Sequence, residues 1–123
     1  MNTKGFTLDG LVNAIEKNTK VVQIKDLEPN QTFVVIVEDE TEYDITIIEP
    51  QEGSILIKGG QFSEPTKCRL NGSTMGGSML WMGRIVLGMC MEISWNGNVL
   101  TTLPVKIIGW RIDPTAIISR TVQ

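Results

Sequence analysis

Short runs of apolar and β-branched residues, some of which alternate with polar residues, strongly constrain what the chain can fold into. The runs at 32–38 (TFVVIVE), 43–49 (YDITIIE) and 54–58 (SILIK) are rich in the β-branched residues that favour strands. Turn-forming residues separate the runs at intervals of about 8–12 residues, which is typical of sandwiches and barrels. The pattern predicts a mainly β chain: a small antiparallel β-barrel or sandwich of about eight short strands.

A segment near the N-terminus departs from this pattern. Its apolar residues follow the i, i+3, i+4, i+7 spacing of one helical face, at Leu8, Leu11, Val12 and Ile15. We therefore expect one N-terminal α-helix over residues 7–18, followed by the barrel or sandwich over residues 20–123. The length of the chain fits a single domain that spans residues 1–123.

The stretch from Asn71 to Met91 concentrates glycine and methionine. It holds five of the six methionines and five of the twelve glycines. Glycine allows backbone conformations that other residues resist, and methionine fills irregular apolar gaps. We expect a bent loop at 72–78, then one long strand at 84–95. The Asn96-Gly97 pair that follows predicts a tight hairpin.

The glycine-rich loop also resembles an anion cradle in composition, because glycine amides and hydroxyls donate hydrogen bonds. The lysine of the Walker pattern is missing, and the run after the loop favours a strand over a helix. A bent structural loop is therefore the alternative to a ligand site. If the loop binds a ligand, the candidate residues are Ser73, Ser78 and Arg84.

The same segment supplies candidates for a protein interface. Interfaces favour tryptophan, methionine and arginine, and here Trp81 and Met82 stand close to Arg84. Burial in the core is the alternative interpretation for Trp81. Strands such as FVVIV are apolar on both faces, so a helix, a second sheet or another subunit must cover the outer side of such a strand.

The chain has no histidine, and this excludes several chemistries. Neither a Ser-His-Asp nor a Cys-His arrangement is possible within one chain, and two cysteines cannot complete a four-cysteine zinc site. The five acids within residues 38–44 lack the glycine and the final glutamate of an EF-hand loop. We interpret them as solvated charge in a turn, with weak binding of a divalent cation as the alternative. We predict no catalytic residues, no metal site and no cofactor.

Cysteine usage and charge bear on location and partners. Cys68 and Cys90 are expected to be small buried residues of a reducing compartment, with a disulfide or a reactive thiol as alternatives. Residues 1–53 carry 4 lysines against 11 acids, a net of −7, and residues 54–123 carry 7 cations against 3 acids, a net of +4. The two halves either interleave and cancel or favour heterologous association.

These observations lead to one functional hypothesis with two alternatives. We expect a cytoplasmic, non-catalytic binding or assembly module that forms homo-oligomers or binds another protein, without contact to membranes. The cations do not cluster in the sequence and aromatic residues are 6%, which argues against nucleic acid. The alternatives are an enzyme that works without histidine and an oligonucleotide-binding barrel.

Overall fold

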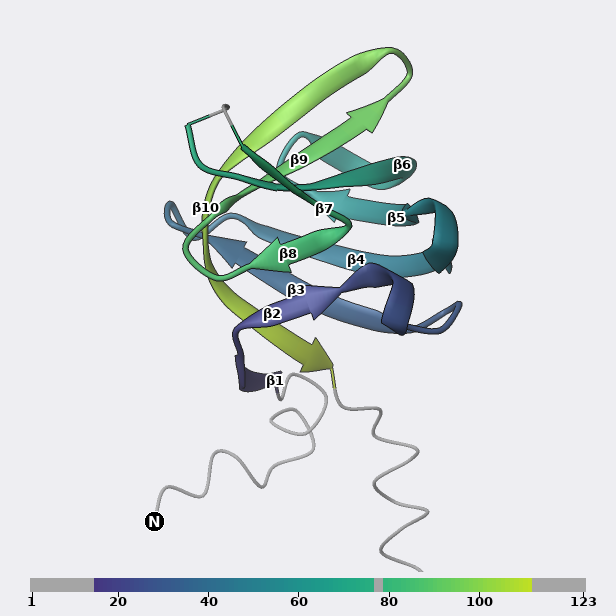
Figure 1. The fold of residues 1–123 in the computed structure, drawn as a ribbon. Helices are drawn as coiled ribbons and strands as arrows, with labels where there is room; N and C mark the ends of the chain where they lie inside the picture. Colours follow the sequence, from purple (N-terminus) through teal and green to yellow (C-terminus); the bar gives the residue numbers. More distant parts are fainter. Residues whose placement is uncertain (1–14, 77–78, 112–123) are drawn as a thin grey trace, which may run out of the picture.

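The computed structural model describes residues 15–76 and 79–111 (Figure 1). Within these ranges the chain forms antiparallel β structure with two short 3-10 turns, η2 (Ile24–Asp26) and η3 (Pro50–Glu52), and no α-helix. None of the helical segments there has the length and hydrophobicity of a membrane span. The strands are β1 (Ile15–Thr19), β2 (Val21–Gln23), β3 (Thr32–Val37), β4 (Glu42–Glu49), β5 (Ser54–Gly59), β6 (Phe62–Thr74), β7 (Leu80–Met82), β8 (Arg84–Val86), β9 (Cys90–Trp95) and β10 (Asn98–Arg111).

Strand β9 pairs with two partners, and its pairing links distant parts of the large sheet. The strand order is β1-β10-β3-β4-β5-β6-β7, while β9 pairs with both β6 and β10. The pairing path therefore runs from β3 through β4, β5, β6, β9 and β10 back to β3. Strand β10 pairs with β9 through its first part and with β3 and β1 through its second part, with register shifts around Pro104.

The side chains that point inward along this path form one core. Alternation is clearest in β4, where Tyr43, Ile45 and Ile47 are buried and the intervening residues are more exposed. Two aromatic pairs extend the core, Phe33 with Trp110 and Phe62 with Trp95. The fully buried side chains come from strands throughout the path and from β8 and η2: Phe33, Ile24, Ile45, Ile47, Ile55, Ile57, Leu70, Ile85, Met91, Ile93, Ile108 and Val34.

Local turn chemistry places the hairpins where the sequence predicts them. Asn96 and Gly97 join β9 to β10 with φ values of 49° and 79°, the left-handed pair that a type I′ turn requires. Gly59 ends β5 with a φ of 124°, and a Cβ there would lie 2.0 Å from the carbonyl oxygen of Glu42. The mainly β, antiparallel fold and the Asn-Gly hairpin are thus confirmed.

The expected N-terminal helix is not supported. Residues 7–14 lie outside the described residues, and residues 15–18 belong to strand β1 instead of a helix. Strand β1 pairs with β10, with Glu16 opposite Trp110 and Thr19 opposite Ile108. The Trp110 indole N–H also donates to the Thr19 hydroxyl at 2.8 Å. At residues 15–18, these non-local bonds hold the chain in a strand where the sequence pattern predicted the end of a helix.

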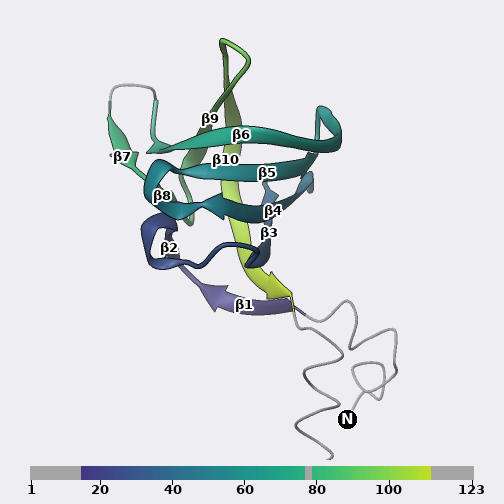
Figure 2. The same ribbon diagram turned by 90° about the vertical axis from the view of Figure 1, so that its right-hand side faces the viewer.

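The long strand expected at 84–95 is divided in two. Strand β8 ends at Val86 and β9 begins at Cys90, with Gly88 between them at a φ of 87°. The Gly88 N–H donates to the Val105 carbonyl, and the Met89 N–H donates to the Val86 carbonyl. The turn lets β8 leave the large sheet and pair with β2, which forms a second, two-stranded sheet. Figure 2 shows β2, β7 and β8 on one side of the stacked strands β3 to β6.

The apolar run of β3 is already buried within one chain. Phe33, Val35 and Val37 belong to the core, and Val34, on the opposite side of the strand, has no exposed surface. Ile36 is half-buried. Of the three covers expected for such a strand, a second subunit is therefore not needed to bury Val34.

Candidate functional site

The bend expected at 72–78 begins later than the sequence indicates, because β6 continues to Thr74. Ser73 is fully buried in that strand. Its hydroxyl donates to the Arg84 carbonyl at 2.8 Å and accepts from the Val86 N–H at 3.0 Å. Ser73 thus ties β6 to β8, and it does not line either cavity described below. Ser78 lies outside the described residues.

Gly72 lets β7 lie close against β6. Its φ is 152°, and a Cβ on this residue would lie 2.2 Å from the carbonyl oxygen of Trp81. The pairing places Gly72 opposite Met82 and Ser73 opposite Trp81. A side chain at position 72 would push the two strands apart, so the glycine is a requirement of this hairpin.

The hairpin carries an exposed apolar surface, which we call the arm: Met75, Met79, Leu80, Trp81 and Met82. All three residues of β7 are exposed although their side chains alternate between the two faces of the strand. Met82 is 72% exposed and Trp81 is 41% exposed. The Trp81 indole N–H contacts the Met79 sulfur at 3.4 Å. Trp81 and Met82, expected from the sequence as interface candidates, therefore lie at the surface.

Strand β7 is also an edge of the sheet. It ends the strand order, and among the described residues its backbone pairs with β6 alone. Edge strands in proteins are commonly protected by charged residues, proline or bulges. From Thr74 to Gly83 the chain has no charged residue and no proline. The arm is thus an apolar edge that lacks charge and proline and is formed by a strand of three residues.

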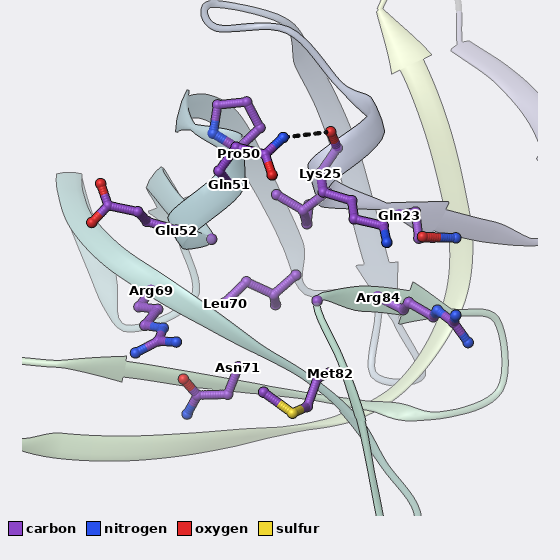
Figure 3. Close-up of a pocket in the computed structure, with 13 residues that line it drawn as sticks. Gln23, Lys25, Pro50, Gln51, Glu52, Arg69, Leu70, Asn71, Met82 and Arg84 are labelled. Atoms are coloured by element: carbon purple, nitrogen blue, oxygen red, sulfur yellow. Dashed lines mark hydrogen bonds between the residues drawn. The ribbon is translucent and has the colours of Figure 1, made fainter.

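A cavity of about 210 Å³ lies beside the arm, between η2, η3, β6 and the start of β8 (Figure 3). Its floor is apolar, since Leu70 and Ile24 are almost completely buried. Arg69 and Glu52 stand on one side of Leu70, and Lys25 and Arg84 stand on the other (Figure 3). Arg84, a candidate from the sequence, reaches this cavity, and sequence reasoning missed Lys25 and Arg69 because they come from separate elements.

Backbone hydrogen bonds hold the walls of this cavity together. The Ile24 N–H donates to the Gly83 carbonyl at 2.9 Å, and the Gly83 N–H donates to the Asn71 carbonyl at 3.0 Å. The Leu70 N–H donates to the Gly53 carbonyl at 2.9 Å. The Gln51 amide donates to the Lys25 carbonyl, which joins η3 to η2 (Figure 3). The frame around the cavity is therefore set by the main chain.

A second, more open depression adjoins the first and shares Gln51, Glu52 and Arg69 with it. Ser94 and Ser54 also line it. The Ser54 hydroxyl oxygen is buried and has no hydrogen-bond partner among the described residues. Lys67 and Glu49 add one charge of each sign, so this depression has no clear charge preference.

The two thiols are poor nucleophiles in this environment. Both cysteines are free, with Cys68 buried and Cys90 half-buried. Burial raises the pKa of Cys68, and burial followed by the charge of Glu38 raises the pKa of Cys90. The raised pKa values keep both thiols protonated at neutral pH. Cysteine catalysis requires the opposite, because the thiolate is the reactive form.

The acidic segment forms the tip of the β3–β4 hairpin, as its position in the sequence indicates. The Thr41 hydroxyl and then its backbone N–H lower the pKa of Asp39, and the N–H lies 3.0 Å from the carboxylate. Glu40 forms an ion pair with Lys106, which links the acidic half of the chain to the basic half. Within residues 15–76 and 79–111, no group of three or more acidic, cysteine or histidine side chains is placed to hold a metal ion.

Comparisons with other proteins add no assignment to this geometry. The chain matches no protein family, no curated protein and no solved structure. The arm and the cavity beside it are therefore the features from which a function can be argued.

Proposed function

We propose that this chain is a small β-barrel that acts as a non-catalytic assembly module and associates with a second copy of itself through the arm. The observation that carries the proposal is β7, whose three side chains are all exposed at a sheet edge without charge or proline. The closed pairing path of β3, β4, β5, β6, β9 and β10 supports the barrel description.

The arm has the composition of an interface centre. Interface cores are enriched in tryptophan and methionine and depleted in charge, and the arm consists of one tryptophan, one leucine and three methionines. Burial of apolar surface contributes about 25 cal/mol for each Å² removed from water. Covering the arm is therefore favourable, and the described residues of one chain do not cover it.

A second copy suits this edge because the arm is neutral. Two identical charged edges would repel each other, but no charge lies between Thr74 and Gly83. Twofold symmetry is the commonest arrangement of homo-oligomers, and it places the same surface on both sides of the interface. Antiparallel pairing of β7 with β7 of the second copy would set Trp81 opposite Trp81, and Leu80 opposite Met82.

Sedimentation velocity over a micromolar concentration series tests the association. We expect the wild-type chain to form a dimer and Met82→Lys to shift it to monomer, since the lysine places like charges across the edge. Val99→Lys is the matched control, because Val99 is 63% exposed on β10 and lies outside the arm. A monomeric wild-type chain, or equal effects of the two lysines, rejects the proposal.

Cysteine cross-linking tests the register in a background where Cys68 and Cys90 are replaced by alanine. Opposite Cα atoms of antiparallel strands lie about 4.5–5.5 Å apart, within the range that disulfides span. Trp81→Cys should therefore cross-link to itself, and Leu80→Cys should cross-link when mixed with Met82→Cys. Self-linking at position 80 or 82 with a wild-type dimer would contradict the twofold register while leaving the association intact.

A further inference from the structure

We propose that the cavity between η2, η3, β6 and β8 binds a small organic phosphate, with the phosphate held by Lys25, Arg69 and Arg84. The proposal does not rest on self-association of the arm. Three cationic side chains and one carboxylate, that of Glu52, line the cavity, which gives it a formal charge of +2. The whole chain carries −3, so the positive charge is concentrated here against the overall balance.

These cations are available to a ligand. Among the described residues, Glu40 and Lys106 form an ion pair, and no carboxylate is within ion-pair distance of Lys25, Arg69 or Arg84. All three side chains are exposed, so their head groups can turn toward a bound anion. The three cations lie on either side of Leu70 (Figure 3), so an anion in the cavity would meet positive charge from both sides.

The chemistry of the cations favours phosphate over a carboxylate. Arginine donates two parallel hydrogen bonds to phosphate oxygens, and the cavity has an arginine on each side of Leu70 (Figure 3). A phosphate monoester has a second pKa of about 6, so at neutral pH it carries close to two negative charges. That charge balances the +2 of the lining side chains.

The floor explains why the ligand is organic. Leu70 and Ile24 are buried beneath the cavity, and Met82 and Pro50 add apolar walls. A volume of about 210 Å³ leaves room for a small apolar group beside the phosphate. The Asn71 amide is already engaged, since it donates to Glu92 at 3.0 Å and accepts from the Ser94 hydroxyl at 2.9 Å. Recognition therefore falls to the three cations and the apolar floor.

Titration with phenyl phosphate, inorganic phosphate and benzoate, followed by calorimetry and by amide NMR shifts, tests the site. We expect phenyl phosphate to bind most tightly, to shift the amides of Lys25, Leu70 and Arg84, and to weaken as salt is added. Equal binding of phenyl phosphate and inorganic phosphate would overturn the organic part of the proposal. Absence of shifts at these residues with every probe would overturn the site itself.

Charge variants separate a site from general attraction. Arg69→Gln combined with Arg84→Gln should lower the affinity for phenyl phosphate at least tenfold, and Lys25→Gln alone should lower it severalfold. Lys58→Gln is the matched control, because it removes one charge from an exposed position on β5 outside the cavity. An equal loss with Lys58→Gln would show charge attraction alone and reject the proposal. Thermal melts of each variant confirm that it is folded.

Discussion

The β3–β4 and β6–β7 hairpins are both antiparallel and rich in apolar residues, yet they have opposite environments. Strand β3 has a neighbour on each side, β10 and β4, and buries Phe33, Val34 and Val35 completely. Strand β7 has one neighbour, β6, and exposes all its residues. Position in the sheet, more than hydrophobicity, therefore decides which apolar strands are buried.

The tips of the two hairpins also differ, in their charge. The β3–β4 tip carries Glu38, Asp39 and Glu40, which keep it solvated and ion-paired. The β6–β7 tip carries methionine and glycine and no charge. One hairpin is thus internal with a charged tip, while the other presents an apolar surface along its length. This contrast supports the proposal that the chain associates with a second copy through the arm.

The largest expected effect comes from truncating a core residue of the first hairpin. Ile45→Ala should lower the free energy of unfolding by about 2–5 kcal/mol, because it leaves a cavity in a fully packed core. Met82→Ala in the second hairpin should change it by less than about 0.5 kcal/mol, because this side chain is largely exposed. Denaturant titration measures both free energies of unfolding. Similar losses for the two variants would contradict the difference in burial between the hairpins.

Glycine substitution tests how closely β7 approaches β6. Backbone strain at a positive φ costs about 1–3 kcal/mol. Gly72→Ala should lower the free energy of unfolding by more than this, because the methyl group also clashes with the Trp81 carbonyl. Gly76→Ala is the control, since its φ is 70° and nothing lies within 4 Å of the added Cβ. Its effect should stay near about 1 kcal/mol. Equal midpoints in chemical unfolding would mean that the strands separate easily.

Two serines compare a satisfied hydroxyl with an unsatisfied one. Ser73→Ala should lower the free energy of unfolding by about 1–3 kcal/mol, because the Val86 N–H and the Arg84 carbonyl lose the buried hydroxyl that they share. Ser54→Ala should be neutral or stabilising, because the Ser54 hydroxyl is buried without a partner among the described residues. Thermal unfolding of the pair is decisive: a greater loss at position 54 contradicts the hydrogen bonding described.

The smallest effect concerns the charged tip of the first hairpin. The pKa of Asp39 is lowered from 3.8 by Thr41, so its contribution to stability is present above pH 3.8 and disappears as the pH falls through the lower folded-state value. Asp39→Ala should therefore unfold at a slightly lower temperature than wild type at neutral pH, and the gap should close in acid. A gap that persists below the folded-state pKa would contradict this origin.

Several strands and one tight turn could be predicted from the sequence. The β-branched runs lie in β3, β4 and β5, and the Asn-Gly pair marks the turn between β9 and β10. These predictions rest on local rules, because side-chain alternation and turn conformation depend on neighbouring residues. Residue type named Trp81 and Met82 as interface candidates but left core burial open for Trp81, and the fold places both at the surface.

The candidate cavity was only partly predictable. Arg84 was named from its place next to the glycine-rich loop, but Arg69 joins it from β6, and Lys25 joins both from η2, more than forty positions earlier in the chain. Ser73 was named for its hydroxyl, whose partners turned out to be backbone groups of β8. A hydroxyl's partner and a convergence of charges depend on distant pairing, which one sequence does not reveal.

Residue types and their spacing were enough to predict the mainly antiparallel β class of this protein, the strands β3, β4 and β5 and the Asn-Gly hairpin. These follow from the period of the side chains and from the conformations that glycine, asparagine and proline allow. Long-range strand pairing determines that residues 15–18 form a strand, that β3 is buried on both sides and that β7 is left at an edge. Such outcomes depend on which distant strand supplies the hydrogen bonds and the covering side chains, and that choice is made by the whole fold.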